Sequence, residues 1–439
     1  MRRHVTMAAR AAALAALAAA GTTMADDWRA EADRRIDEYR KGDFAVTCVY
    51  ANGKPVAGAK VRIRQTRSSF HFGTCIGGDP FGQSPDEKRY TRYILDHFNA
   101  LVCENAMKWY ATERTKDKLT FDDADRLMKF AEANGLAMRG HCLFWSKPKY
   151  VQAWVRQLTN DQLRRYVGRH LADIVPRWRG RLVAWDVNNE MLDGSFYAGR
   201  LGESIRAEMF KRAHELDPCT PLFVNEYGVL CNDEKLGRYA ALIGKLRKAA
   251  APVGGIGVQE HAAQRFAAAL RGVDANETRP ERQVPGGLEP RAVWRRLDRL
   301  GQFGLPIHIT EVSSKTPDER LRAETLETFL RVAYAHPKVE AFLLWGFWAR
   351  RHWLGPQAAL VEADWKPNAA GRAVSKLLLE EWRTNLEATT DAAGVVRFRG
   401  FAGTYELTTA TPGGTAATAT VTLPRPGPAR VVLQRTRTR

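Results

Sequence analysis

The sequence has few cysteines, and none of them is spaced like a zinc ligand. Its 439 residues include six cysteines and no Cys-x-x-Cys or Cys/His pattern, so a zinc site is not predicted. The even number permits disulfide bonds, but the dense framework of a small secreted domain is absent. Only Cys219 and Cys231 are close enough in sequence to suggest a pair. Cys75, Cys103 and Cys142 each end an apolar run and are expected as buried free thiols.

Long hydrophobic runs are missing after the first 25 residues, so no later segment is predicted to cross a membrane. Residues 1–25 place Arg2 and Arg3 ahead of the apolar run AARAAALAALAAAG and end in small residues before Asp26, which is the pattern of an export signal. We expect cleavage after Ala25, with an uncleaved anchor as the alternative. The mature protein is then expected to be secreted or periplasmic, with no membrane contact.

Acidic residues are in the minority. The chain has 67 Lys and Arg residues against 49 Asp and Glu, a net charge of +18. Removal of residues 1–25 takes away three arginines and no acid, so the charge falls by three to +15. Basic surfaces attract nucleic acid, anionic lipid or acidic polymers. An exported protein seldom meets nucleic acid, so we expect a solvated basic surface, with attraction to an acidic polysaccharide as the alternative.

The composition is that of a globular protein. Hydrophobic residues make up 45% of the chain, which is ample material for a core. Short apolar runs alternate with longer segments that have apolar residues three and four apart, such as FDDADRLMKFAEANG and DQLRRYVGRHLADIV. The predicted strands begin near Phe70, Asn99, Leu136, Leu182, Pro221, Gly254, Leu305 and Ala341. Eight such alternations predict an α/β fold, a (β/α)₈ barrel. A doubly wound sheet is the alternative, but the glycine-rich phosphate loop after its first strand is missing.

The two flanks of the barrel have a strand pattern without a helical period. The stretch DFAVTCVYANGKPVAGAKVRIRQ indicates a β-hairpin that turns at Asn52-Gly53, and short strands with glycine turns follow from about Glu387. We hypothesise that the hairpin packs with this C-terminal β-module. The predicted organisation is a signal peptide at 1–25, an N-terminal helix and β-hairpin extension at 26–69, the catalytic barrel at 70–385, and a small β-module with a basic tail at 386–439.

The ends of the predicted barrel strands are unusually polar. In such barrels the functional groups gather at the carboxyl ends of the strands, so these side chains are expected to form one site. They are Glu104, Asn105, Lys108, His141, Trp145, Asn189, Glu190, Asn225, Glu226, Tyr227, Gln259, Glu260, His261, Thr310, Glu311 and Trp345.

Carboxylates, amides, imidazoles and indoles together suit a polysaccharide. Two acids across a barrel mouth can divide the cleavage of an acetal, because one protonates the departing oxygen while the other attacks or activates water. Tryptophan offers a flat apolar face to a sugar ring. An isolated Glu at a strand end is more often a helix cap or an ion-pair partner, and Glu260 is interpreted as a rim residue or an ion-pair partner. Glu190 and Glu311 stand apart because each ends a strand among polar neighbours.

These residues lie in motifs that resemble the family 10 glycoside hydrolases, the endo-β-1,4-xylanases. The motifs are CENAMKW, RGHCLFW, WDVNNEML, FVNEYG, GIGVQEH, HITEV and LLWGFW, in the order of that family, from about Phe70 to Trp382. The resemblance implies that Glu190 is the general acid/base and Glu311 the nucleophile of a retaining double displacement on xylan. This mechanism needs no metal or organic cofactor, and a structural calcium is left open.

The same resemblance assigns roles around the two acids. An ionised Glu311 calls for hydrogen-bond donors, and His261 and Gln259 are the candidates. Glu190 must begin protonated, which burial beside a second carboxylate favours. Asn189 is expected to hold the sugar 2-hydroxyl. The expected sugar contacts are Glu104, Asn105 and Lys108 on the non-reducing side of the cut, His141, Trp145, Gln259, His261, Trp345 and Trp353 around the reacting ring, and Tyr227 from the fifth strand.

The sequence departs from the family pattern at three places. Ser146-Lys147-Pro148 stands where His-Ser-Gln is usual, Ser313 stands where an acidic residue usually follows the nucleophile, and Arg350-Arg351 follow the last strand. These changes leave the pH optimum and the preferred decoration of the xylan chain open. The two arginines favour chains with acidic branches, or else simply face solvent.

Two rival functions remain at the level of sequence. The same barrel could act on another β-glycan such as a β-glucan, or it could be a polysaccharide-binding protein that has lost catalysis. The pair Glu190 and Glu311 argues against the second. The C-terminal module contains no tryptophan, so we interpret it as a structural extension, with a carbohydrate-binding domain as the alternative. We expect a monomer whose partner is xylan or a related plant cell-wall polysaccharide.

Overall fold

The computed structural model describes residues 28–77, 82–266, 289–410, 416–424, 427–432 and 434–435. The predicted signal peptide at 1–25 lies outside these residues, as does the end of the basic tail. Within the described part of the chain, no helix has the length and apolar character needed to cross a membrane.

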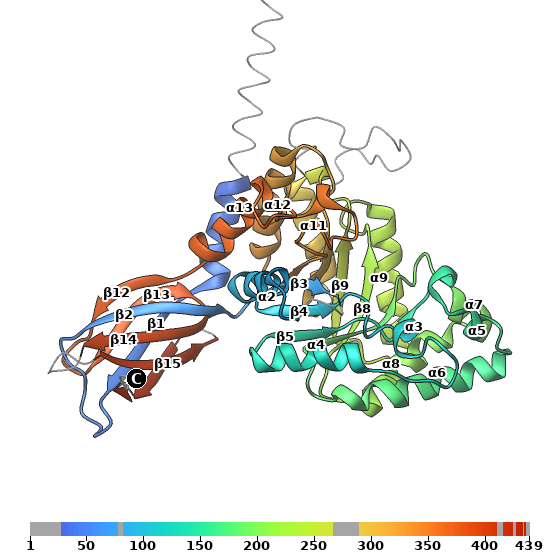
Figure 1. The fold of residues 1–439 in the computed structure, drawn as a ribbon, viewed down its shortest axis with the longest axis horizontal. Coiled ribbons are helices and arrows are strands. Elements are labelled where there is room, and N and C mark those ends of the chain that lie inside the picture. The colour runs from blue at the N-terminus through green and yellow to red at the C-terminus, as the bar shows by residue number, and fades with distance from the viewer. Residues whose placement is uncertain are drawn as a thin grey trace, which may run out of the picture.

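Eight parallel strands close into a barrel, as the alternation of the sequence predicts (Figure 1). The ring is closed because β11 pairs with β3 and β5 pairs with β7. All eight predicted strands are present, and a short extra strand, β6, pairs with β7. The barrel strands are β3 (His71–Ile76), β4 (Ala100–Cys103), β5 (Ala137–Gly140), β7 (Ala184–Asn189), β8 (Leu222–Tyr227), β9 (Gly255–Glu260), β10 (Ile307–Val312) and β11 (Val339–Leu344), with β6 at Phe144–Trp145.

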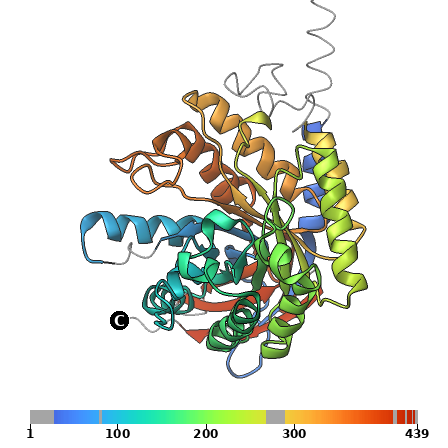
Figure 2. The same ribbon diagram turned by 90° about the vertical axis from the view of Figure 1, so that its right-hand side faces the viewer.

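Helices surround the barrel and cover the outer faces of its strands (Figure 2). Several begin at side-chain caps; the hydroxyl of Ser84 accepts the Glu87 N–H at the start of α2, and Asp318 caps α12. Residues 28–40 are helical. The others are α2 (Pro85–His97), α3 (Trp109–Thr112), α4 (Asp122–Ala133), α5 (Ala153–Arg156), α6 (Asn160–Ile174), α7 (Phe196–Leu201), α8 (Ser204–Leu216), α9 (Asp233–Lys248), α11 (Pro290–Gly301), α12 (Glu319–Tyr334) and α13 (Ala369–Lys376).

The two flanks of the chain form one β-sandwich beside the barrel (Figure 1). One sheet has the order β13-β1-β16 and the other the order β12-β2-β14-β15-β17. The packing of the N-terminal strands with the C-terminal module is therefore confirmed. The strands are β1 (Lys41–Val49), β2 (Lys60–Ser68), β12 (Asn385–Thr389), β13 (Val395–Phe401), β14 (Gly403–Ala410), β15 (Ala416–Leu423), β16 (Gly427–Val432) and β17 (Gln434–Arg435).

The predicted N-terminal hairpin forms only at its turn. The Gly53 N–H donates to the Tyr50 carbonyl, but β1 pairs with β13 and β16 whereas β2 pairs with β12 and β14. Each strand has one apolar face, and an isolated two-stranded hairpin would leave it uncovered. In opposite sheets, Phe44 of β1 and Ile63 of β2 instead enter one buried core.

The aromatic residues of the C-terminal segment are buried as well: Phe398 and Tyr405 lie in the sandwich core, and Phe401 lies in the core of the barrel. Phe398, Phe401 and Tyr405 are 8%, 3% and 0% exposed, so none of them offers a face to a sugar. All six cysteines lie within the described residues and are free; Cys219 is exposed, and no bond joins it to Cys231.

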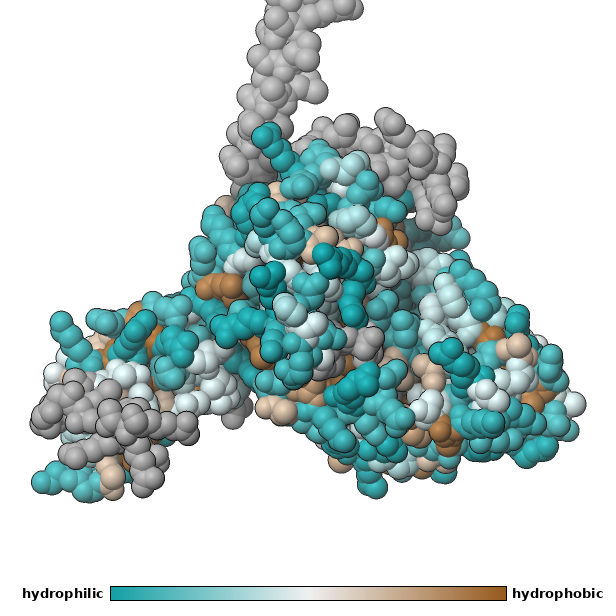
Figure 3. Space-filling model, viewed as in Figure 1, coloured by the Kyte–Doolittle hydropathy of each residue, from teal (hydrophilic) through white to brown (hydrophobic). Residues whose placement is uncertain are grey.

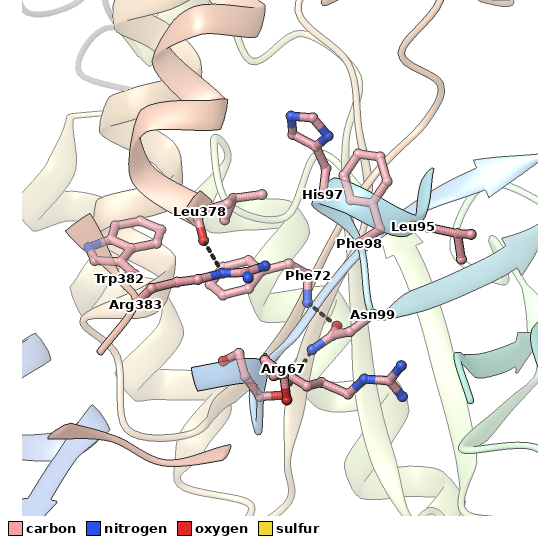
Figure 4. Close-up of a pocket in the computed structure, with 11 residues that line it drawn as sticks. Arg67, Phe72, Leu95, His97, Phe98, Asn99, Leu378, Trp382 and Arg383 are labelled. Atoms are coloured by element: carbon pink, nitrogen blue, oxygen red, sulfur yellow. Dashed lines mark hydrogen bonds between the residues drawn. The ribbon is translucent and has the colours of Figure 1, made fainter. Parts of the chain in front are cut away.

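Hydrogen bonds at the foot of the barrel join it to the sandwich. The Arg67 guanidinium donates to the carbonyls of Asn134 and Gly135, and the Asn99 side chain accepts the Phe72 N–H and donates to the Ser68 carbonyl at the end of β2. Figure 4 shows the small hollow that Arg67, Phe72 and Asn99 help to line, near the amino end of β3. It lies at the opposite end of the barrel from the polar strand ends. The face in Figure 3 is mostly hydrophilic, with hydrophobic residues scattered singly.

Candidate active site

Glu190 lies at the first position after β7, in an uncommon backbone conformation. Its φ is +58°, the left-handed region that non-glycine residues seldom adopt. Its N–H donates to the Asn225 carbonyl at 2.9 Å, and the residue is 7% exposed. The backbone therefore turns abruptly at the strand end and leaves the carboxyl group at the mouth of the barrel.

The loop after Glu190 packs directly on the loop after Trp145. A Cβ atom at Gly194 would lie 2.6 Å from the carbonyl carbon of Ser146 and 2.8 Å from the Lys147 nitrogen, so only glycine fits there. The Ser146 hydroxyl donates to the Asn188 side chain at 2.6 Å. This contact brings Lys147 Nζ to 2.8 Å from a Glu190 carboxylate oxygen. A departure from the family pattern thus touches one of the two predicted acids.

Glu311, near the end of β10, is 5% exposed and surrounded by donors. The Asn225 amide donates to its Oε1 at 2.9 Å, His261 Nε2 lies 3.3 Å from Oε2, and His141 Nε2 lies 3.9 Å from Oε1. Burial would raise the pKa of Glu311, but the two imidazoles and the Lys108 ammonium outweigh burial and lower it. Glu311 is therefore held ionised, as a nucleophile must be.

The donors to Glu311 differ from the predicted ones at one position. His261 is in place, but the Gln259 amide donates to Asn189 Oδ1 at 3.0 Å instead of to Glu311. Asn225, on β8 between β7 and β9, takes that role and also donates to Asn189 Oδ1 at 3.0 Å. Since the carbonyl oxygen of Asn189 accepts both amides, its own amide group is left as a donor, which suits the predicted bond to a sugar hydroxyl.

A short chain of hydrogen bonds supports His261. The Trp353 indole N–H donates to the Ser313 hydroxyl at 3.1 Å, and this hydroxyl lies 3.2 Å from His261 Nδ1. Because the hydroxyl oxygen already accepts from Trp353, its proton is free to be donated to Nδ1. Nε2 then carries the ring proton that faces Glu311. Ser313, which stands where the family pattern usually has an acidic residue, is thus the hydrogen-bond partner of His261 Nδ1.

Aromatic rings and one lysine form the wall on the other side of Glu311. The ring of His141 lies edge-on to Trp345 at 5.2 Å, and Lys108 Nζ lies 4.5 Å from the centre of the Trp145 ring and 6.0 Å from that of Trp345. Lys108 also reaches the Asn105 side chain at 3.4 Å. These contacts place a positive charge and two flat apolar faces beside Glu311.

A buried ion pair under the site orients His141. Asp186 lies 2.9 Å from His141 Nδ1 and receives the Arg139 guanidinium through both carboxylate oxygens. Burial would raise the pKa of Asp186, but Arg139 and His141 lower it. With Nδ1 bonded to Asp186, the Nε2 atom of His141 points toward Glu311.

A second polar group lies beside Glu190 and includes residues to which sequence reasoning gave no role. The buried Glu226 accepts the Leu192 N–H at 2.9 Å and lies 3.4 Å from Lys235 Nζ. Burial raises the pKa of Glu226 to about 7, against the pull of Lys235. Lys235 also lies 2.6 Å from Asp193. No sequence pattern indicates that Lys235 contacts the Glu226 carboxylate, because α9, which carries Lys235, comes near the site only in the folded chain.

The predicted Tyr227 lies within this second group. Its hydroxyl donates to Asp193 and lies 3.3 Å from Lys147. The ammonium groups of Lys147 and Lys235 lie 4.3 and 3.3 Å from the centre of its ring. Tyr227 therefore faces the Glu190 side of the site, away from the wall around Lys108.

The structure thus brings the predicted site residues to one end of the barrel. Glu104, half-buried after β4, lies within electrostatic reach of Lys108, whereas Trp353 is 49% exposed and packs its ring at 5.0 Å from that of His261. Glu260 is not at the rim: it is 3% exposed, and burial raises its pKa. The roles of these side chains as sugar contacts stay predictions.

Comparisons with known proteins agree with this geometry. The family model described as Glycosyl hydrolase family 10 matches residues 63–377. The chain is 39% identical over 386 residues to the protein named Anti-sigma-I factor RsgI6 of Acetivibrio thermocellus, covering 88% of this chain and 47% of that one. It is 36% identical over 380 residues to Endo-1,4-beta-xylanase 1 of Arabidopsis thaliana, covering 85% and 37%. The chain therefore spans about half the length of these relatives, or less.

A solved structure shows the same architecture. Xylanase 10B from Thermotoga petrophila RKU-1, described in complex with xylobiose, superposes with a TM-score of 0.61 at 25% identity. The superposition covers 71% of this chain and 95% of the other.

Proposed function

The chain belongs to glycosyl hydrolase family 10, and from this premise we propose that it is an endo-acting retaining glycosidase that hydrolyses internal β-1,4-xylosidic links of xylan. The observation that carries the proposal is the arrangement of two buried carboxyl groups at the ends of β7 and β10. Glu311 accepts a hydrogen bond from Asn225 and lies against His261, and Glu190 directly follows a different strand, β7.

In the first step, Glu311 attacks the anomeric carbon and Glu190 gives its proton to the departing oxygen. The positive charge that develops on the sugar ring is stabilised by the Glu311 carboxylate. Asn189 presents its amide group beside the nucleophile, where a bond to the 2-hydroxyl strengthens in the transition state. The first step yields a glycosyl-enzyme and a free leaving sugar.

In the second step, Glu190 removes a proton from water, which attacks the same carbon and releases Glu311. Two displacements restore the original configuration. The Lys147 ammonium, 2.8 Å from Glu190, pairs with the carboxylate that exists between the two steps.

Two further features of the whole protein belong to the proposal. Residues 1–25 support export to a secreted or periplasmic location, after which the protein contacts no membrane. A monomeric state is the matching expectation, and light scattering on the purified protein tests it.

A second candidate function is polysaccharide binding without turnover. It is favoured by one observation: a relative that is 39% identical over most of this chain is named as an anti-sigma factor and not as an enzyme. The two candidates differ in whether xylan is cut.

The test is release of reducing sugar from glucuronoxylan, arabinoxylan and carboxymethylcellulose by the wild type, Glu190→Ala and Glu311→Ala proteins. We expect the wild type to hydrolyse the xylans and both variants to lose that activity while keeping the circular dichroism of the wild type. Faster hydrolysis of carboxymethylcellulose would transfer the proposal to another β-glycan. A folded wild type that binds xylan but cuts none of the three would establish the binding function instead.

Azide distinguishes the roles of the two acids. With an aryl xyloside whose leaving group needs no acid, Glu190→Ala accumulates the glycosyl-enzyme, and azide attacks it to give the β-xylosyl azide. In Glu311→Ala the azide replaces the nucleophile and gives the α-anomer in one displacement. Proton NMR of the products separates these outcomes, and the same anomer from both variants would contradict the assignment.

A further inference from the structure

The loop that follows Glu190 is held from outside the barrel by two helices. The Met191 carbonyl accepts the Arg206 guanidinium of α8 at 3.2 Å, and the Leu192 carbonyl accepts the Arg238 guanidinium of α9 at 3.1 Å. The left-handed backbone of Glu190 is unfavourable for a residue with a side chain, and it persists only where the surroundings fix it. These contacts supply part of that support.

A buried side chain holds the same loop from the barrel wall. Glu226, on β8, is 0% exposed, and its Oε2 accepts the Leu192 N–H at 2.9 Å. The preceding residue of β8, Asn225, accepts the Glu190 N–H on its carbonyl at 2.9 Å. Two consecutive residues of one strand therefore bond to the chain on either side of Met191, which fixes the turn at its beginning and at its end.

The charge of Glu226 is balanced inside the same group of residues. Lys235 Nζ lies 3.4 Å from Glu226 Oε1 and 2.6 Å from Asp193, which belongs to the loop after Glu190. A buried carboxylate is tolerated when it has such a counter-charge and its oxygens are hydrogen-bonded. Because Glu226 has no exposed surface, it cannot contact a sugar, and any effect on the reaction must pass through the loop.

We propose that Glu226 is a positioning residue for the general acid: by holding Leu192, it fixes the turn that directs the Glu190 carboxyl group at the departing oxygen. Without an acceptor for the Leu192 N–H, the loop relaxes and the carboxyl group leaves the position from which it gives its proton. This inference rests on the proposed function for the role of Glu190, and it deepens that proposal by adding a third carboxyl group.

The experiment uses two leaving groups, because only one of them needs the acid. Xylotetraose is cleaved with a sugar alkoxide as leaving group, which requires a proton, whereas the phenolate of a dinitrophenyl β-xylobioside leaves without one. The readout is kcat/KM on each substrate, which reports the first displacement. It is measured on the full chain as wild type, Glu226→Leu and Glu226→Gln, each checked by circular dichroism for the wild-type fold.

Glu260 provides the matched control. It ends β9, is 3% exposed, and accepts the Ala262 N–H at 3.1 Å in the loop after its own strand. Glu260→Leu therefore removes a similarly buried carboxylate from a loop that does not carry Glu190. We expect this variant to change kcat/KM on the two substrates alike.

We expect Glu226→Leu to lower kcat/KM on xylotetraose about ten- to a hundredfold, part of the roughly hundredfold to ten-thousandfold that a general acid contributes. The loss on the aryl substrate should be less than about twofold. Glu226→Gln keeps one acceptor oxygen and should lose about two- to fivefold on xylotetraose alone, so it carries the test if Glu226→Leu does not fold.

Equal losses on the two substrates in the folded Glu226 variants, wild-type rates on xylotetraose, or the same selective loss in Glu260→Leu would overturn the inference alone. A wild type that hydrolyses neither substrate would overturn the proposed function and the inference with it.

Discussion

Replacing Ser313 by alanine tests how the nucleophile is held. The Ser313 hydroxyl joins the Trp353 indole at 3.1 Å to His261 Nδ1 at 3.2 Å, and the other ring nitrogen of His261 lies 3.3 Å from Glu311. In Ser313→Ala this chain loses its central member. His261 then keeps only its contact with Glu311 and is free to turn.

The size of the effect follows from exposure. Both groups that lose a partner reach solvent, because the side chain of His261 is 26% exposed and Trp353 is 49% exposed. Water can replace the lost hydroxyl, so the cost is that of one ordinary hydrogen bond, about 1 kcal/mol. It is smaller than the cost of leaving a buried polar group without any partner. This corresponds to about a fivefold fall in kcat/KM on xylan.

The direction of the pH dependence distinguishes this role from a purely structural one. The hydrogen bond from His261 is among the causes that lower the pKa of Glu311. Loosening His261 raises that pKa, so the acid limb of the kcat/KM profile moves to higher pH in Ser313→Ala. The measurement is a pH series of initial rates on a soluble xylo-oligosaccharide.

Ser314 provides the matched control. It is as buried as Ser313, 2% exposed, and its hydroxyl has no hydrogen-bond partner among the described residues. Ser314→Ala should leave both the rate and the profile near those of the wild type. The reasoning is refuted if Ser313→Ala stays within twofold of the wild type with an unmoved acid limb, or if the two variants change alike.

Three other predictions concern charge and folding. Lys147→Met should slow the hydrolysis of xylan, because it removes the ammonium that lies 2.8 Å from Glu190 and pairs with the carboxylate present between the two steps; a rate equal to that of the wild type would contradict this. Arg139→Met leaves a buried carboxylate and should cost about 3–5 kcal/mol in urea denaturation at neutral pH. Since Arg139 and His141 lower the pKa of Asp186 on folding, the ion pair stabilises the fold above about pH 4, and this stability is lost as the pH falls through the folded pKa. The difference between the two unfolding curves should therefore shrink as the pH is lowered below about 4. Deletion of residues 386–439 should abolish soluble expression, because β1 and β2 lose their partners; a soluble, cooperatively folded product would refute it.

The barrel was predictable because its signal is local and repeated. Each buried strand is a short apolar run, such as FHFGTCI, and each helix between strands has apolar residues three and four apart. The pairing of the two N-terminal strands was not predictable, because residues far along the chain decide which strand each of them pairs with. The alternating patterns of β1 and β2 are correct, yet each pairs with strands more than 300 residues later.

The site was predictable in its members and less so in its contacts. The motifs placed Glu190 and Glu311 at the site. They predicted Gln259 as a donor to Glu311, whereas the structure has Asn225 in that role, because the contact depends on the direction in which each side chain points. The pairing of β7 with β8 shifts register between Asp186 and Asn188, and that of β10 with β9 shifts before Glu311. Such irregularities re-aim side chains at strand ends, and they leave no trace in sequence spacing.

The positions that depart from the family pattern share a physical property: Lys147, Ser313 and Arg351 lie outside the buried strands. A change within a strand must keep the packing of the barrel, whereas a change in a loop after a strand alters only the charges and donors that face the substrate. Lys147 pairs with Glu190, and Ser313 bonds to the histidine that contacts Glu311. The two carboxyl groups can therefore stay in place at the strand ends while the loops change the charges and hydrogen-bond donors around them.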